Sequence, residues 1–215
     1  MIDGSPIVAI VTGIKRPTSN RKTGPLAQLW ILPQEVNPVE ALKTGADAGI
    51  CGACPHRGIK GKQRGCYVNV GQAPLAAWKS WDAGNKPRVE PESVQPTKNV
   101  RGIRLGAYGD PAALPVEVLE ALVSGYEYHT GYTHQWQRFP ELASLVMASV
   151  ETAAQAKVAH SDGWRTFSTD SSAPDSIECP SDSRGTQCAD CRLCGGASEA
   201  RSIFITPHGT GSAFV

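Results

Sequence analysis

The sequence predicts an α/β protein, a compact or incomplete parallel β/α barrel with cysteine-rich metal-binding loops. Three observations support this fold. From Val100 onward, apolar strand-like segments alternate with helix-like segments, which is typical of a parallel sheet. The 215 residues suit a single domain but fall short of the roughly 250 residues of a complete eight-stranded barrel. Polar and aromatic residues recur where the apolar segments end. An open, doubly wound sheet is the alternative.

The first half of the chain is expected to supply two strands and two helices. The strands are placed at 6–12 and 27–32, and the helices at 38–44 and 75–83. Pro38 suits the first turn of a helix and Gly45 its end. The stretch 84–99 has three prolines and little apolar content, so we expect it at the surface.

The second half is expected to carry the regular β/α alternation. We place strands at 100–110, 131–136, 144–150 and 164–169, and helices at 115–128 and 151–161. In parallel α/β folds the functional residues gather at the carboxyl ends of the strands. Asp110 and His134 lie at such ends and are the candidate catalytic residues. The alternatives are that Asp110 bonds only local backbone and that His134 is a structural histidine.

Composition and charge narrow the class of protein. A hydrophobic content of 40% is too high for a disordered chain. No apolar run approaches the roughly 18 residues of a membrane span, and the N-terminus lacks a signal-peptide pattern, so a cytoplasmic protein is expected. The net charge of +1 hides a split, because residues 1–105 carry 15 Lys and Arg against 7 Asp and Glu. This basic half could face nucleic acid or nucleotides.

The seven cysteines fall into two sets, and this is the most informative feature of the sequence. The first set is Cys51, Cys54 and Cys66, in a loop spanning 49–70. The second set is Cys179, Cys188, Cys191 and Cys194, in a segment spanning 178–197. An odd total in a reducing compartment favours metal binding or catalysis over a disulfide framework.

Each set predicts a different kind of metal centre. Four thiolates would close either a tetrahedral zinc site or a [4Fe–4S] cluster, and C-x2-C-x2-C is more typical of iron–sulfur loops. Three thiolates would leave one iron of a [4Fe–4S] cluster open. In a zinc protein, His56 could complete the first set and His208 could replace Cys179 in the second.

The two sets, together with RLGAYGDP, GYTHQW and VMASV, resemble a group of little-characterised phage-encoded proteins. That group is similar to a distant branch of the radical S-adenosylmethionine barrel enzymes. The resemblance spans about Ile14 to Gly209. It implies an open [4Fe–4S] cluster on the first set that binds S-adenosylmethionine, and an auxiliary cluster on the second. It also implies cofactor contacts from Tyr67, Gly106 and Tyr108, and an enzyme modifying nucleic acid or nucleotides in the host cytoplasm.

Two other functions remain open. The chain also resembles phage-encoded relatives of the tRNA-guanine transglycosylases, which exchange guanine for a deazaguanine in DNA. That resemblance implies that Asp110 is the nucleophile and that the C-terminal cysteines hold a structural zinc. The other possibility is a non-enzymatic, zinc-stabilised nucleic-acid-binding protein that uses the basic half of the chain.

Overall fold

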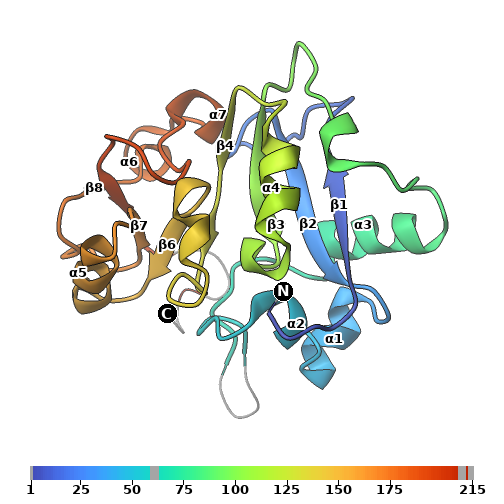
Figure 1. The fold of residues 1–215 in the computed structure, drawn as a ribbon, viewed down its shortest axis with the longest axis horizontal. Coiled ribbons are helices and arrows are strands. Elements are labelled where there is room, and N and C mark those ends of the chain that lie inside the picture. The colour runs from blue at the N-terminus through green and yellow to red at the C-terminus, as the bar shows by residue number, and fades with distance from the viewer. Residues whose placement is uncertain (1, 59–62, 208–211, 213–215) are drawn as a thin grey trace.

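Two mainly parallel sheets frame the protein, seen here in a computed structural model that describes residues 2–58, 63–207 and 212 (Figure 1). The first sheet has the order β1-β2-β3-β4, in which β1 and β2 are antiparallel and the other pairs are parallel. The second has the order β5-β6-β7-β9-β8, and all its pairs are parallel. The strands are β1 (Ile7–Thr12), β2 (Leu26–Pro33), β3 (Gly102–Tyr108), β4 (Tyr128–Thr130), β5 (Tyr132–Thr133), β6 (Met147–Val150), β7 (Thr166–Ser168), β8 (Ser176–Glu178) and β9 (Ser202–Phe204).

Gly131 joins the two sheets. It alone separates β4 from β5, so one stretch of chain pairs with β3 at its start and with β6 at its end. A Cβ at this position would lie 2.9 Å from a methyl of Val146 and 3.0 Å from the Cβ of Leu105, which explains the glycine. Strand pairing therefore runs from β1 to β8 as an open series. Within the described residues no pairing closes it into a barrel.

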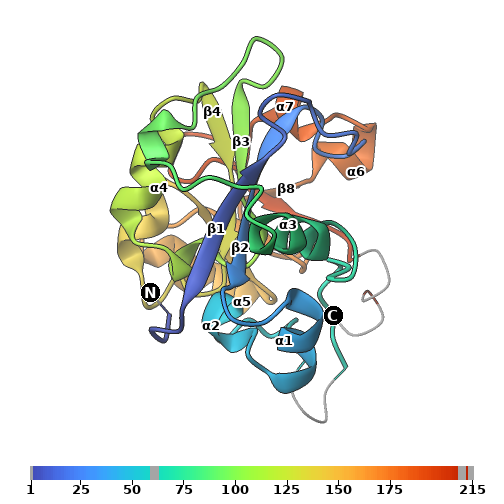
Figure 2. The same ribbon diagram turned by 90° about the vertical axis from the view of Figure 1, so that its right-hand side faces the viewer.

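Helices cover the sheets on both sides. Figure 2 shows α4 on one side of the β1–β4 sheet and α3 on the other. Helix α5 packs against β6 and β7. The helices are α1 (Pro38–Thr44), α2 (Ala48–Cys51), α3 (Ala73–Asp82), α4 (Val116–Val123), α5 (Ala153–Ser161), α6 (Pro180–Arg184) and α7 (Cys188–Cys191), with 3-10 turns η1 (Pro91–Ser93), η2 (Pro111–Ala113) and η3 (Pro140–Ser144). None of the helices in the described residues is long and apolar enough to cross a membrane.

The core lies between the central strands and these helices. Strand β2 is buried along nearly its whole length, because both of its faces are covered. Its Leu29 and Ile31 pack in one hydrophobic cluster with Ile103 and Leu105 of β3 and Leu119 of α4. This cluster fixes the central strands, and with them the carboxyl ends where the candidate residues lie.

Local signals predicted some elements well and others poorly. Helix α1 has the predicted bounds, because Asn37 accepts hydrogen bonds from the backbone N–H groups of Val39 and Glu40 and Gly45 ends the helix with φ 83°. The prediction of a helix over 115–128 was wrong at its end. Helix α4 stops at Val123, before Ser124 and Gly125, which have low helix propensity, and Tyr128 begins β4.

The predicted strand at 131–136 was too long. Only Tyr132 and Thr133 pair as a strand, because the Thr133 hydroxyl then accepts a hydrogen bond from the backbone N–H of Gln135 and turns the chain. Strand β8 and the short helices α6 and α7 were not predicted, since they span only three to five residues each.

Replacing Gly109, in the turn after β3, is expected to destabilise the fold. It has φ 83°, and an added Cβ would lie 2.5 Å from the carbonyl oxygen of Ile31 and 2.7 Å from its Cβ. We expect Gly109→Ala to lower the free energy of unfolding by about 2–4 kcal/mol through backbone strain and overpacking. Gly163→Ala is the matched control, because Gly163 has φ 82° with open space around it. Equal losses in urea denaturation would show that the contact with Ile31 is unimportant.

Candidate metal centres

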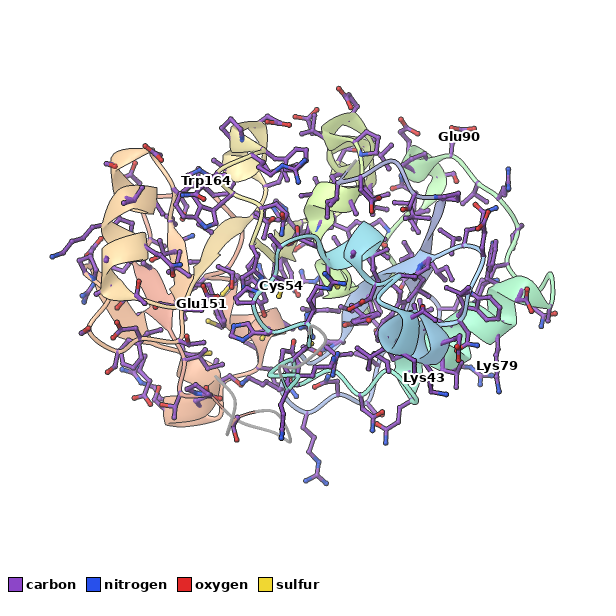
Figure 3. The ribbon with its side chains drawn as sticks, turned by 90° about the horizontal axis from the view of Figure 1, so that it is seen from below. Lys43, Cys54, Lys79, Glu90, Glu151 and Trp164 are labelled. Carbon is purple, nitrogen blue, oxygen red and sulfur yellow. The ribbon has the colours of Figure 1, made fainter. Side chains whose placement is uncertain are left out.

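The first cysteine set (Cys51, Cys54 and Cys66) is brought together by backbone hydrogen bonds. Cys51 ends α2, and the N–H of Cys54 donates to its carbonyl oxygen at 3.1 Å. The N–H of Cys66 donates to the carbonyl oxygen of His56 at 2.9 Å, which returns the chain to the C-x2-C turn. Figure 3 views this end of the molecule, with Cys54 and Glu151 near its middle. Thiols 15 positions apart in sequence therefore share one site.

The three thiols influence one another electrostatically. Burial raises the pKa of Cys51, and the charges of Cys54, Asp47 and Cys66 raise it further. Burial also raises the pKa of Cys66, against the opposing charge of Arg64. A metal cation among these sulfurs would favour their thiolate forms. The charges of these three side chains therefore act on one another.

Two histidines and a glutamate lie beside this set. His134 follows β5, Glu151 follows β6, and His56 comes from the cysteine loop. The Nε2 atoms of His134 and His56 lie 2.9 Å and 3.3 Å from the same Oε1 atom of Glu151. The Cys54 sulfur is 4.0 Å from Nε2 of His134. The carboxyl ends of two parallel strands thus face the cysteine loop.

The carboxylate of Asp110 is hydrogen-bonded to the backbone of His134. Its side chain is buried, and Oδ1 accepts hydrogen bonds from the Thr133 hydroxyl at 2.6 Å and from the N–H of Ala112 at 3.0 Å. Oδ2 accepts from the backbone N–H of His134 at 2.9 Å. Burial raises the pKa of this carboxyl, while these hydrogen bonds lower it. Both oxygens therefore accept hydrogen bonds, and Oδ2 positions the backbone of His134.

Replacing Asp110 tests this positioning role. In Asp110→Asn, the amide places an N–H group against a buried donor, so we expect a loss of about 1–3 kcal/mol in the free energy of unfolding, measured with urea. The control is Asp162→Asn, because Asp162 is an exposed residue at the end of α5. An unchanged stability of Asp110→Asn would argue against the hydrogen-bond network around His134.

Tyr108, a candidate cofactor contact, ends β3 beneath the first cysteine set. Its hydroxyl is buried and has no hydrogen-bond partner among the described residues. Burial raises the pKa of this phenol, and the charges of Cys51 and Asp47 raise it further. A buried hydroxyl without a partner is costly, so Tyr108 carries an unmet hydrogen bond close to the first cysteine set.

The other two candidate cofactor contacts have different surroundings. Gly106 has φ 70°, and a Cβ there would lie 2.7 Å from the carbonyl oxygen of Gly109, so tight packing explains this glycine. Tyr67 is half-exposed, and its hydroxyl is bonded to the buried guanidinium of Arg104. The charge of Cys188, in the second set, also acts on Arg104. Arg104 thus interacts with residues of both cysteine-bearing segments.

Two basic residues of the first loop, Arg57 and Arg64, are bonded within the protein. Arg57 forms a bidentate pair with buried Asp47, at 2.9 Å and 3.2 Å. Arg64 donates to the carbonyl oxygens of Cys66 and Val68. Lys60 and Lys62 lie outside the described residues.

The second cysteine set (Cys179, Cys188, Cys191 and Cys194) lines one small pocket. Cys179 begins α6, and α7 runs from Cys188 to Cys191. The N–H of Cys188 donates to the carbonyl oxygen of Lys22, which anchors α7 to the N-terminal half. His208, the proposed alternative ligand, lies outside the described residues. Four thiols, two of them from α7, therefore line the same pocket.

Burial and the charges of neighbouring thiols also raise a thiol pKa in the second cysteine set. Burial raises the pKa of Cys194, and the charges of Cys188, Cys179 and Cys191 raise it further. Arg165 fixes the loop around Cys194, because its guanidinium donates to the carbonyl oxygens of Leu193, Gly196 and Arg201 at 2.6–2.8 Å. Arg165 directly precedes β7, so these hydrogen bonds tie the loop around Cys194 to the second sheet.

Two features of these centres were not predicted from the sequence. Glu151 was expected only as the start of a helix, although its place directly after a strand was a usable signal. The ion pair of Arg57 with Asp47 was not predicted, and nothing in the sequence indicates it. Comparisons with family models, curated proteins and solved structures find no match for this chain.

Proposed function

We propose that this protein is a metal-cluster enzyme that binds an open [4Fe–4S] cluster on its first cysteine set and a closed one on its second. The observation that carries the proposal is the convergence of three thiols at the carboxyl ends of parallel strands, where α/β enzymes place their chemistry. Under this proposal the fold is an incomplete β/α barrel with its cofactor at that edge.

The donor sets fit this assignment. Three thiols can hold a four-iron cluster and leave one iron free for another ligand, whereas four thiols close a cluster. The C-x2-C-x2-C spacing of Cys188, Cys191 and Cys194 is more typical of iron–sulfur loops than of structural zinc sites.

Cys51, Cys54 and Cys66 would hold the open cluster, and that cluster would supply the electron for reductive cleavage of S-adenosylmethionine. Around it, the buried hydroxyl of Tyr108 would donate a hydrogen bond to the bound ligand, and Tyr67 would border the site from beside Cys66. Asp110 would position His134 and not act on substrate. The substrate class we propose is nucleic acid or nucleotide, on the basis of the basic half of the chain.

The transglycosylase alternative receives no support from the geometry. It requires Asp110 to attack a ribose carbon, but both oxygens of Asp110 accept hydrogen bonds from neighbouring groups and the side chain is buried. The zinc-stabilised binding protein is retained as an outcome of the experiment below.

Metal analysis of anaerobically purified protein tests the proposal. We expect a brown protein with absorbance near roughly 400 nm and about eight irons and eight sulfides per chain. With a low-potential reductant, it should convert S-adenosylmethionine to 5′-deoxyadenosine and methionine. A colourless protein with one or two zinc ions would overturn the iron–sulfur assignment. Iron–sulfur protein that leaves S-adenosylmethionine intact would overturn only its use as cofactor.

A further inference from the structure

We propose that His56, His134 and Glu151 form a separate site for one divalent transition-metal ion, Mn²⁺ or Fe²⁺ by its ligand chemistry, directly beside the first cysteine set. This site does not depend on the iron–sulfur assignment, since none of its three ligands is a cysteine. Two imidazoles and one carboxylate, with further positions left open, are typical ligands of mononuclear iron and manganese.

The distances between the ligand atoms fit one shared ion. Metal–nitrogen and metal–oxygen bonds of about 2.0–2.2 Å place neighbouring ligand atoms about 3 Å apart. Here the nitrogens of His134 and His56 are 2.9 Å and 3.3 Å from the Glu151 oxygen, and all three atoms lie within 4.8 Å of one another. The two rings meet edge to face, with an interplanar angle of 73°, so both nitrogens converge on the same region.

Each ligand is held by its own backbone contacts. The N–H of His134 donates to Asp110, and the N–H of Glu151 donates to the side chain of Gln155 at 2.8 Å. The carbonyl of His56 accepts from the N–H of Cys66. Sites whose ligands are fixed before binding lose little entropy when the metal enters.

The side chains of this site are partly exposed to solvent. The side chains of His56, His134 and Glu151 retain 16%, 18% and 24% of their exposure. An ion there would keep open positions for water or a substrate oxygen. Cys54 lies at its border, 4.0 Å from His134, so a ligand of this ion would also face the first cysteine set. In this proposal His134 is a metal ligand, and the acid–base role considered from the sequence is the competing outcome.

Manganese titration of the full-length chain tests the site, because Mn²⁺ prefers carboxylate and imidazole and binds thiolates poorly. The protein is kept anaerobic and unreduced, with its cysteine-bound metals retained, and free Mn²⁺ is followed by electron paramagnetic resonance. We expect one bound Mn²⁺ per chain, with nitrogen couplings from two histidines in pulsed spectra. Glu151→Gln should weaken binding more than about 10-fold, since even residues that only orient a ligand contribute about 10–100-fold.

Two control variants separate this site from its neighbours. Glu120→Gln removes an exposed carboxylate of α4 and should leave Mn²⁺ affinity unchanged. Cys66→Ser removes a thiol of the first set and should leave the two-histidine couplings in place. The absence of Mn²⁺ binding would overturn the proposal and leave His134 and Glu151 as a hydrogen-bonded acid–base pair. Unweakened binding in Glu151→Gln, or loss of binding in Cys66→Ser, would also overturn it.

Discussion

Cys54→Ser is expected to lower the iron content from about eight to about four atoms per chain and to abolish cleavage of S-adenosylmethionine. Cys54 lies 4.0 Å from His134 and its charge acts on Cys51, and the substitution removes one of the three thiols proposed for the open cluster. With two thiolates left, that cluster is not retained. The second set is a separate pocket and should keep its iron. Iron analysis and detection of 5′-deoxyadenosine measure the two effects.

Cys191→Ser provides the matched comparison. It removes one of four thiols from the second set, and the first set is made by a different loop. Iron should again fall, but the spectrum of the remaining cluster should change when S-adenosylmethionine is added, which it should not do in Cys54→Ser. If Cys54→Ser retains all its iron and its activity, the assignment of the open cluster to the first set is wrong.

The sequence predicted the strands and helices that depend on local signals. Strand β2 is an apolar run with one polar residue, Gln28. Helix α1 is directly preceded by its cap, Asn37, and directly followed by its terminating glycine, Gly45. Elements too short to show a period, such as α6 and α7, were missed because periodicity needs more residues than they contain. Their positions depend on tertiary contacts, such as the hydrogen bond from Cys188 to Lys22.

Several residues of the candidate site could be predicted from the sequence, but their arrangement in space could not. The grouping of the cysteines into three and four follows from spacing, and the placement of His134 follows from the rule on strand ends. That Glu151 meets His134 follows from the neighbouring, parallel arrangement of β5 and β6, which the sequence does not specify. That Asp110 is a buried anchor depends on its exposure, which a polar turn sequence does not reveal.

Arg57→Ala is expected to destabilise the protein by about 3–5 kcal/mol, the loss typical when one partner of a buried ion pair is removed. Asp47 retains only 1% of its side-chain exposure, so without Arg57 its charge would be buried and unpaired. Arg57 also donates to the carbonyl oxygens of Gly45 and Gly52, which flank α2. Urea denaturation of the metal-free protein measures this loss without a contribution from metal binding.

A double-mutant cycle shows whether the unpaired charge is the cause. Asp47→Ala combined with Arg57→Ala should be more stable than Arg57→Ala alone, because no buried charge remains. Arg101→Ala is the control, since the pair of Arg101 with Glu127 is about half exposed and should contribute at most about 1 kcal/mol. Equal losses in Arg57→Ala and Arg101→Ala would refute the buried pair.

Since Arg57 ties α2 to the loop that carries Cys54, its loss should also speed the release of metal from the first cysteine set and leave the second unaffected.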